Sequence, residues 1–403
     1  MSGRARQTRG GGRRAGGAKF AKIRLAQTAS RTEAARRQNR FLKLTLGGLA
    51  LFAAAFATHN FVERWSDRHE LAERRLVAFN LLRHDRIEEF IEVAREDVQL
   101  WSRHPMIIED ARAFFADWSA MSREERNAME AEFRPGGMLD TDTSARTPAE
   151  QVYVAHFQRY QPTLARFIDT HDFYDLFLFT PEGELAFTVV RESDFGNSLD
   201  DASDPVFGTG LAQVAEAALS ADDPDAVFLS DFAPYAPSDG AMAAFVASPL
   251  VSETGQSIGA FAVQLNLDIF DEMLLYNEGL GETGFSLVVG ADGRARNTVP
   301  RLGDKGKALR DVPPNPALLA AQQGEEAFGR MTGGDGVARL VAARPLKIGP
   351  HDWVVMTEMD VAEVREPLWA YLWLYLASLL GVGLTAFISY RILRSETRTG
   401  VEE

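Results

Sequence analysis

The sequence predicts an α+β protein in which a long N-terminal helix precedes two tandem modules with antiparallel sheets, all flanked by two transmembrane helices. Two uncharged apolar runs, 44–62 and 368–390, lie toward the two ends of the 403-residue chain. A stretch with helical periodicity follows the first run, and two similar sets of alternating residues follow that stretch. These three features give the fold class and the order of the domains.

Each apolar run is long enough to cross a bilayer, because roughly 20 helical residues span the hydrocarbon core of about 30 Å. A cleaved signal peptide is the alternative for the first run, since Ala55-Phe56-Ala57 resembles a cleavage site. The leader, residues 1–43, is long for such a peptide, and this favours an uncleaved anchor.

Charge predicts the orientation of the two spans. Thirteen Lys and Arg residues precede the first span, against the single acid Glu33, and Arg391, Arg394 and Arg398 follow the second. Basic flanks stay in the cytoplasm, so both termini are predicted on the cytoplasmic side of the membrane, with the main domain on the other side. The basic leader is interpreted as a disordered topology signal that contacts anionic lipid. The net charge of −14 argues against a nucleic-acid binder, and the absence of cysteine excludes disulfides and thiolate metal sites.

A single apolar stripe runs along the helical stretch that follows the first span. Its members recur at helical spacing and are flanked by charged residues, as in an amphipathic helix. Periodicity alone leaves two interpretations open, a dimer seam or a face packed on the domain. The pattern breaks at Pro135-Gly136-Gly137 and resumes after Pro148. The stripe consists of Ile87, Phe90, Ile91, Ala94, Val98 and Trp101.

The period then changes from 3.6 to 2, which is typical of strands. Thr180-Pro-Glu-Gly183 reads as a turn between the first two strands, and a helix is inserted up to Leu219. The predicted unit is a PAS-like sandwich of one antiparallel sheet and helices. Its strands are expected at 175–179, 185–190, 226–232, 242–251 and 258–267.

The same unit recurs further along the chain. Residues 176–183 correspond to 286–293 at an offset of 110, and Thr188-Val189 corresponds to Thr298-Val299 at the same offset. Later matches pair 245–250 with 340–346 and 258–267 with 353–359. The shared order predicts two copies of one fold. The predicted domains are a basic arm (1–43), a first span (44–62), a helical stalk (63–149), a membrane-distal module (150–279), a membrane-proximal module (280–366), a second span (367–390) and a tail (391–403).

Over residues 60–366 this organisation resembles the double Cache sensor domain of bacterial chemoreceptors, sensor kinases and adenylate or guanylate cyclases. The stretches that carry the resemblance are 175–189, 193–196, 230–238 and 279–284. It implies that the distal module holds a small ligand and that the proximal module relays the change. The motif of the amino-acid-binding members is absent from 195–202, and Pro237 stands where they carry an Asp, so the resemblance does not support an amino-acid ligand.

Several motifs are better explained as structure than as chemistry. Gly279-x-Gly281-x-x-Gly284 matches a dinucleotide fingerprint, but a strand follows it where a helix is required, so a tight turn is expected. Residues 333–336 are interpreted as a hairpin turn. The seven histidines lack His-x3-His spacing, and the acidic stretches at 200–201 and 222–225 read as solvated loops. No catalytic residue, cofactor or metal site is predicted.

The candidate ligand site combines an acid with aromatic residues on one strand face and polar groups at the end of the third strand. Such a mixture of apolar walls and a few polar groups is typical of small-molecule sites. Two members have structural alternatives, because Asp231 could cap a turn and Tyr235 could fill the rim. The candidates are Tyr174, Asp175, Phe177, Asp231, Tyr235 and Ser238.

The leading functional hypothesis is a non-enzymatic, membrane-anchored sensor of an unidentified small molecule. With only residues 391–403 after the second span, its output is expected to pass to a separate signalling partner. A homodimer is expected from the long helix, and Gly381 and Gly383 suit either close helix contact or lipid-facing positions. The alternative hypothesis is a periplasmic scaffold that binds a partner protein. A third hypothesis treats the chain as the severed input half of a one-piece receptor.

Overall fold

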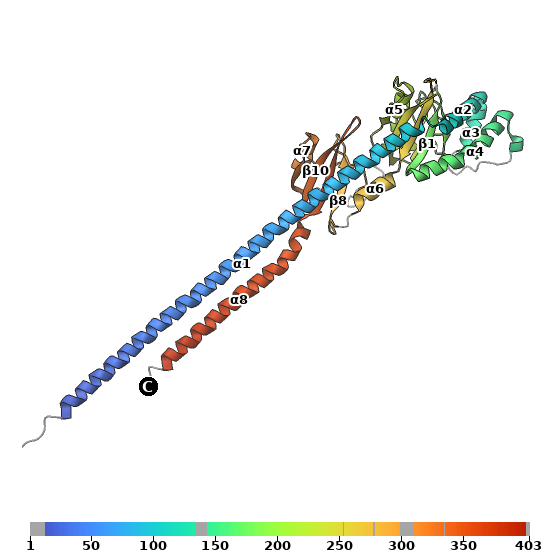
Figure 1. Ribbon diagram of the computed structural model, residues 1–403. Helices are drawn as coiled ribbons and strands as arrows, with labels where there is room; N and C mark the ends of the chain where they lie inside the picture. The colour runs from blue at the N-terminus through green and yellow to red at the C-terminus, as the bar shows by residue number, and fades with distance from the viewer. Residues whose placement is uncertain are drawn as a thin grey trace, which may run out of the picture. The chain divides into compact units, whose positions relative to one another are not determined.

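The computed structural model describes residues 13–133, 143–252, 254–276, 279–298, 310–333 and 335–399. It divides into two compact units, which Figure 1 shows as a ribbon. Unit 1 comprises Met1–Glu70 and Val364–Glu403, and unit 2 comprises Leu71–Glu363. Some of the sequence predictions fall outside the described residues: the break at 135–137, the repeat position Val299, Gly334 of the predicted hairpin, and the ends of the chain at 1–12 and 400–403.

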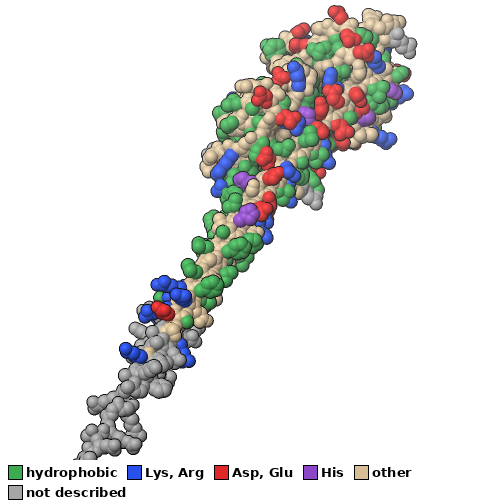
Figure 2. Space-filling model, turned by 60° about the vertical axis from the view of Figure 1, so that its left-hand side comes forward, with side chains coloured by type: hydrophobic (Ala, Val, Ile, Leu, Met, Phe, Trp, Pro, Cys, Tyr) green, Lys and Arg blue, Asp and Glu red, His purple; other side chains and the backbone are tan. Residues whose placement is uncertain are grey.

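Unit 1 consists of parts of two helices, α1 (Arg13–Trp101) and α8 (Val361–Thr399). Both contain a stretch long and apolar enough to cross a membrane, within Arg36–Trp101 and at Tyr371–Arg391. The helices run side by side, and Thr58 Oγ1 lies 2.9 Å from the hydroxyl of Tyr375. Figure 2 shows hydrophobic side chains along this stem and Lys and Arg side chains at its end. The two flanking helices predicted from the sequence are confirmed.

The basic arm differs from its prediction as a disordered segment. Helix α1 begins at Arg13, so residues 13–43 continue the helix of the first span. The arm is rich in Ala, Arg, Lys and Gln, which have high helix propensity and extend an existing helix at little cost. The composition of residues 13–43 suggested disorder, whereas these residues extend the helix of the adjoining span.

The apolar stripe of α1 packs on the body of unit 2. Ile87, Ile91 and Val98 are fully buried in a core that also contains residues of the distal sheet. This decides between the two interpretations of the stripe in favour of the packed face. The same core receives three further helices from the range predicted as stalk and from the start of the distal module: α2 (Pro105–Ala120), α3 (Arg123–Phe133) and α4 (Pro148–Thr170).

The distal sheet has the antiparallel order β2-β1-β7-β6-β3. Helix α5 (Gly210–Leu219) covers one face, and α1, α2 and α4 cover the other. A small hairpin of β4 (Ala233–Tyr235) and β5 (Ala241–Ala243) lies between β3 and β6 in the chain, and α6 (Leu267–Leu275) follows the sheet. The sheet strands are β1 (Phe173–Phe179), β2 (Leu185–Thr188), β3 (Phe228–Leu229), β6 (Phe245–Val251) and β7 (Ser257–Leu265).

The proximal sheet repeats this topology with one strand fewer. Its order, β8-β11-β10-β9, corresponds to β1-β7-β6-β3, and α7 (Pro316–Gln322) occupies the place of α5 in the chain. The counterpart of β2 is reduced to one bridge between Val289 and Ala295. The predicted tandem repeat is therefore confirmed. The strands are β8 (Phe285–Val289), β9 (Ala327–Thr332), β10 (Ala338–Ile348) and β11 (His351–Asp360).

The glycine-rich sequence at 279–284 forms the predicted turn, between α6 and β8. Gly281 has φ +88°, and a Cβ there would lie 1.9 Å from the carboxylate of Glu363. The backbone N–H groups of Glu282 and Thr283 donate to that carboxylate at 2.8 and 2.9 Å. The backbone donors of this turn thus bind a carboxylate of the chain itself, where a dinucleotide fingerprint would bind phosphate.

Candidate functional site

Side chains of alternating residues on β1 point toward α5. Phe177 and Phe179 lie in the core shared with α5, and Asp175 precedes them on the same face. In the register of β1 and β7, Asp175 is opposite Gln264. The sheet therefore places two polar side chains side by side at the end of an otherwise apolar face.

Asp175 is a fully buried carboxylate. Its Oδ2 accepts a hydrogen bond of 2.5 Å from the hydroxyl of Thr188 on β2. Burial and the charge of Asp194 raise the pKa of Asp175, the hydrogen bonds offset part of this rise, and the net result is a pKa of about 8. Oδ1 accepts from the backbone N–H groups of Leu176, Val189 and Val190.

Asp194 is a second fully buried carboxylate, and sequence reasoning did not single it out. Its Oδ2 accepts a hydrogen bond of 2.6 Å from the hydroxyl of Tyr235 on β4. Its Oδ1 is buried and has no hydrogen-bond partner. Burial raises the pKa of Asp194 to about 7, and the nearby Glu192 contributes to the rise. The backbone N–H groups of Asp194 and Phe195 oppose part of this rise. One oxygen of this buried carboxylate therefore lacks a hydrogen-bond partner.

Gln264 supplies another buried acceptor that lacks a partner, its Oε1. Aromatic rings line the same face, since the rings of Tyr235 and Phe245 lie 4.8 Å apart and those of Phe177 and Phe245 lie 6.0 Å apart. We use the name acidic pocket for the buried side-chain cluster of Asp175, Asp194, Tyr235, Phe245 and Gln264, which pack together in the interior of the distal module.

The rim of the acidic pocket is closed by Glu192. Its carboxylate accepts hydrogen bonds from the hydroxyl of Tyr174, at 2.9 Å, and from that of Ser238. Burial and Glu192 together raise the pKa of Tyr174, so this phenol stays protonated as a donor. Tyr174 is partly exposed to solvent, whereas the carboxylates beneath it are buried.

Both pocket carboxylates are uncompensated by positive charge. Within the described ranges, neither Asp175 nor Asp194 forms an ion pair with Lys, Arg or His, and carboxyl groups are the main charges acting on their pKa values. Both oxygens of Asp175 accept hydrogen bonds, whereas Oδ1 of Asp194 has no partner. Burying a carboxylate without a cation or full hydrogen bonding is costly, so Asp194 carries most of this cost. The pocket is therefore suited to a group that brings positive charge and N–H donors.

The structure brings four of the six candidates together around Glu192 and Asp194: Tyr174, Asp175, Tyr235 and Ser238. Phe177 lies in the apolar wall behind them. Two signals in the sequence could have revealed the additional residues. Asp194 belongs to the stretch 193–196 that carries the family resemblance, and Gln264 interrupts an apolar strand.

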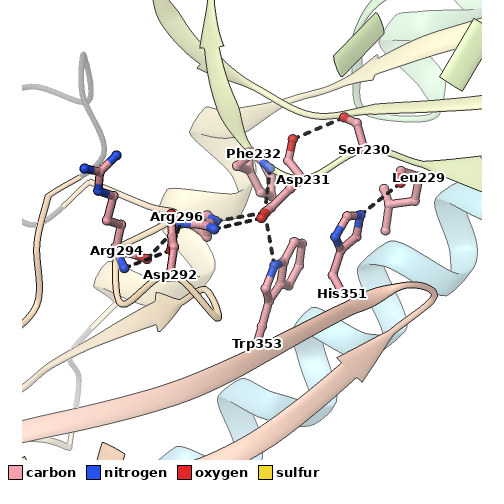
Figure 3. A network of polar contacts seen from close by, with 9 residues as sticks. All are labelled: Leu229, Ser230, Asp231, Phe232, Asp292, Arg294, Arg296, His351 and Trp353. Atoms are coloured by element: carbon pink, nitrogen blue, oxygen red, sulfur yellow. Dashed lines mark hydrogen bonds and ion pairs between the residues drawn. The ribbon is translucent and has the colours of Figure 1, made fainter. Parts of the chain in front are cut away.

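Asp231 lies in a different network, at the boundary of the two modules (Figure 3). Arg296 of the proximal module donates to both of its carboxylate oxygens, at 2.8 and 2.7 Å. Asp231 also accepts from the backbone N–H of Phe232 at 2.8 Å, in line with the turn-capping alternative. It is engaged in contacts between modules and does not line the acidic pocket.

Among the described residues, a groove beside α2 and a cluster of potential metal ligands on α1 differ from the acidic pocket. A groove of about 760 Å³ beside α2 contains an ion pair between Arg103 and Asp225, so charges of both signs are present there. His84, Asp85 and Glu88 on α1 form one cluster of potential metal ligands within the described ranges, and none of them belongs to the acidic pocket. Neither feature combines buried acceptors with missing partners.

No family model and no curated protein matches this sequence. Solved structures do match it. The chain is similar to ligand-binding domains of bacterial chemoreceptors. Those of Pseudomonas fluorescens CtaA, in complex with L-isoleucine, and of the Pseudomonas aeruginosa amino-acid chemoreceptor PctC, in complex with GABA, are both 17% identical with a TM-score of 0.41. They cover 75% and 72% of this chain and 98% and 99% of their own.

The ligand-binding domain of Campylobacter jejuni Tlp3, in complex with 4-methylisoleucine, is 10% identical with a TM-score of 0.43. It covers 74% of this chain and 95% of its own. The ligands in those complexes are properties of those proteins.

Proposed function

We propose that this protein is a non-enzymatic, membrane-anchored sensor whose distal module binds a small molecule with a cationic, N–H-donating group. The observation that carries the proposal is the pair of buried, uncompensated carboxylates Asp175 and Asp194, with Oδ1 of Asp194 unpartnered. The basic residues beside both spans support cytoplasmic termini and a periplasmic main domain in a bacterial inner membrane.

An ammonium group fits the chemistry of the pocket. It has three donors and no acceptor, and the pocket offers acceptors at Asp194 Oδ1 and Gln264 Oε1. Its charge would compensate the two carboxylates, and the rings of Tyr235 and Phe245 would add cation–π attraction. Entry requires Glu192 to release Tyr174 and Ser238, because the pocket is closed by these hydrogen bonds.

The test measures the melting temperature of the full-length protein in lipid nanodiscs. Each amine is added in one sample, and a neutral compound of similar shape is added in another. Ethanolamine, propylamine and putrescine are the amines; ethylene glycol, propanol and butanediol are neutral controls of similar shape. We expect only amines to raise the melting temperature, since a ligand at 100 times its Kd stabilises the folded state by about 2.7 kcal/mol.

The variant Asp194→Asn should abolish this response. The matched control is Asp110→Asn, which changes another buried Asp of unit 2 with a raised pKa, of about 6, and an unpartnered oxygen. Equal responses to amines and alcohols, or loss of the response in both variants, would contradict the proposal. A protein partner captured by crosslinking, with no response to any amine, would favour the scaffold hypothesis.

We also propose that the sensor is a homodimer that signals to a separate partner in or at the membrane. The face of α1 opposite the packed stripe carries exposed apolar residues at helical spacing along unit 2. Because the chain has no cysteine, Leu82→Cys offers a clean test, with disulfide formation between copies expected in native membranes. Glu92→Cys, at another exposed position of α1, is the control. The face consists of Leu71, Ala78, Leu82, Val93 and Leu100.

A further inference from the structure

A joint between the two modules is built on one buried arginine of the proximal module. Arg296 is almost fully buried, and its Nε and Nη2 donate to the two carboxylate oxygens of Asp231 at 2.8 and 2.7 Å. Its Nη1 donates to Asp292 at 2.9 Å. Gly290 makes room for this side chain, because a Cβ there would lie 2.0 Å from Nη2. Such bidentate pairing fixes orientation as well as distance.

Strand β11 holds the same distal segment from a second side (Figure 3). Trp353 Nε1 donates to Asp231 Oδ1 at 3.1 Å, and the rings of Trp353 and Phe232 lie 5.9 Å apart. One ring nitrogen of His351 lies 2.9 Å from the backbone oxygen of Leu229. Residues 229–232 are thereby fixed to two separate parts of the proximal module. We call these contacts the module joint.

The module joint and the acidic pocket are connected by a short piece of chain. Phe232 is followed directly by β4, whose last residue, Tyr235, donates to Asp194. A ligand that engages Asp194 changes the hydrogen bonding of Tyr235 and with it the position of β4. Since residues 229–232 are fixed to the proximal module, that module must either move with β4 or lose the ion pair between Arg296 and Asp231.

We infer that Arg296 is the positioning residue that couples the acidic pocket to the proximal module, acting through Asp231. The coupling acts through the joined positions of β4 and the proximal module, so a shift of β4 changes the conformation that the proximal module adopts. It does not depend on the identity of the ligand, and a change in the pocket made by mutation should be transmitted in the same way.

The chain offers a closely matched control in Arg339. This arginine is also buried in the proximal module and is also paired with carboxylates, those of Asp335 and Asp360. All of its described ion-pair partners belong to the proximal module itself. Its replacement removes a buried charge of the same kind and leaves the module joint intact.

The experiment is hydrogen exchange on the full-length protein in nanodiscs. Tyr235→Phe serves as the stimulus, since it removes the hydroxyl that donates to Asp194. In the otherwise unchanged protein, and in the Arg339→Met background, we expect Tyr235→Phe to alter exchange of the amides of β8 and β11 by roughly threefold or more. In the Arg296→Met background we expect that response to vanish while the response around β4 persists.

An undiminished response of β8 and β11 in Arg296→Met would overturn the inference, and so would its absence from the otherwise unchanged protein. If Arg296→Met does not fold, Asp231→Asn provides the same comparison from the distal side, with the same two outcomes. No ligand is added at any stage, so failure of the ligand proposal leaves this result unaffected.

Discussion

The two modules share one sheet topology but differ in whether their buried charges are paired with charges of opposite sign. The distal module buries Asp175 and Asp194 without a described cation, whereas the proximal module buries Arg296 and Arg339, each paired with carboxylates. At the repeat offset of 110, Asp175 corresponds to Phe285, which contacts the apolar core of the proximal module. The compensated charges hold parts of the structure together, and in our proposal the uncompensated ones form the ligand site.

Arg339→Met removes one of the two compensated arginines of the proximal module. Of the variants considered, it should lower the free energy of unfolding the most. It leaves Asp335, Glu358 and Asp360 without their shared cation, and removing one partner of a buried ion pair costs about 3–5 kcal/mol. Denaturant unfolding of the full-length protein measures the loss of free energy. Arg330→Met, at an exposed position of β9, is the control and should change stability by less than about 0.5 kcal/mol.

The free energy of unfolding should depend on pH because of the two uncompensated carboxylates, Asp175 and Asp194. The folded-state pKa values of Asp175 and Asp194, about 8 and about 7, lie above those of the unfolded chain. Between about pH 4 and 8 the folded state holds protons that the unfolded state has lost, so stability falls as pH rises through this window. Of the groups facing the pair, Glu192 contributes by raising the pKa of Asp194, and Tyr235 stays protonated, since its own pKa is raised.

We expect roughly 2–4 kcal/mol of stability to be lost between pH 5 and 8, measured as the free energy of unfolding across a pH series. Asp194→Asn should flatten the profile. A profile that rises over this window in the parent protein would show that both carboxylates are compensated by a cation in solution.

Asp194→Asn should stabilise the protein at pH 8 while removing its response to amines. The substitution removes an uncompensated buried charge, and changes that relieve a strained binding site commonly add about 0.5–2 kcal/mol. Thermal unfolding at pH 8, with and without amine, measures both effects. A destabilised variant would indicate that the carboxylate has a structural role like those of the proximal module.

Sequence patterns predicted the parts of the molecule that depend on local periodicity. The spans, the tandem repeat of one α+β unit and the turns at Gly183 and Gly281 follow from apolar spacing and from glycine at positive φ. The pocket was predicted only in part, because Asp194 and Gln264 are brought to Asp175 by the sheet register and by a loop, neither of which a single strand reveals.

Asp231 illustrates the limit most clearly. From the sequence it stands four residues before Tyr235 and looks like part of the same site. In the structure their polar ends point to different partners, Arg296 for Asp231 and Asp194 for Tyr235. The partner of Asp231 is 65 residues further along the chain, and such a pairing between modules leaves no local signal in the sequence.

The rim provides the prediction with the smallest effect on stability. Tyr174→Phe and Ser238→Ala each remove one hydroxyl that donates to Glu192 at a partly exposed site, so each should change the free energy of unfolding by about 0.5–1 kcal/mol. Both should nevertheless speed the association of an amine, because the closed rim opens more readily when Glu192 has one donor fewer. Stopped-flow binding by the full-length protein in nanodiscs measures this rate, and Tyr276→Phe, at an exposed tyrosine outside the pocket, is the control. If both rim variants bind amines at the parent rate, the ligand enters by another route, and the role of Glu192 in closing the rim of the acidic pocket loses its support.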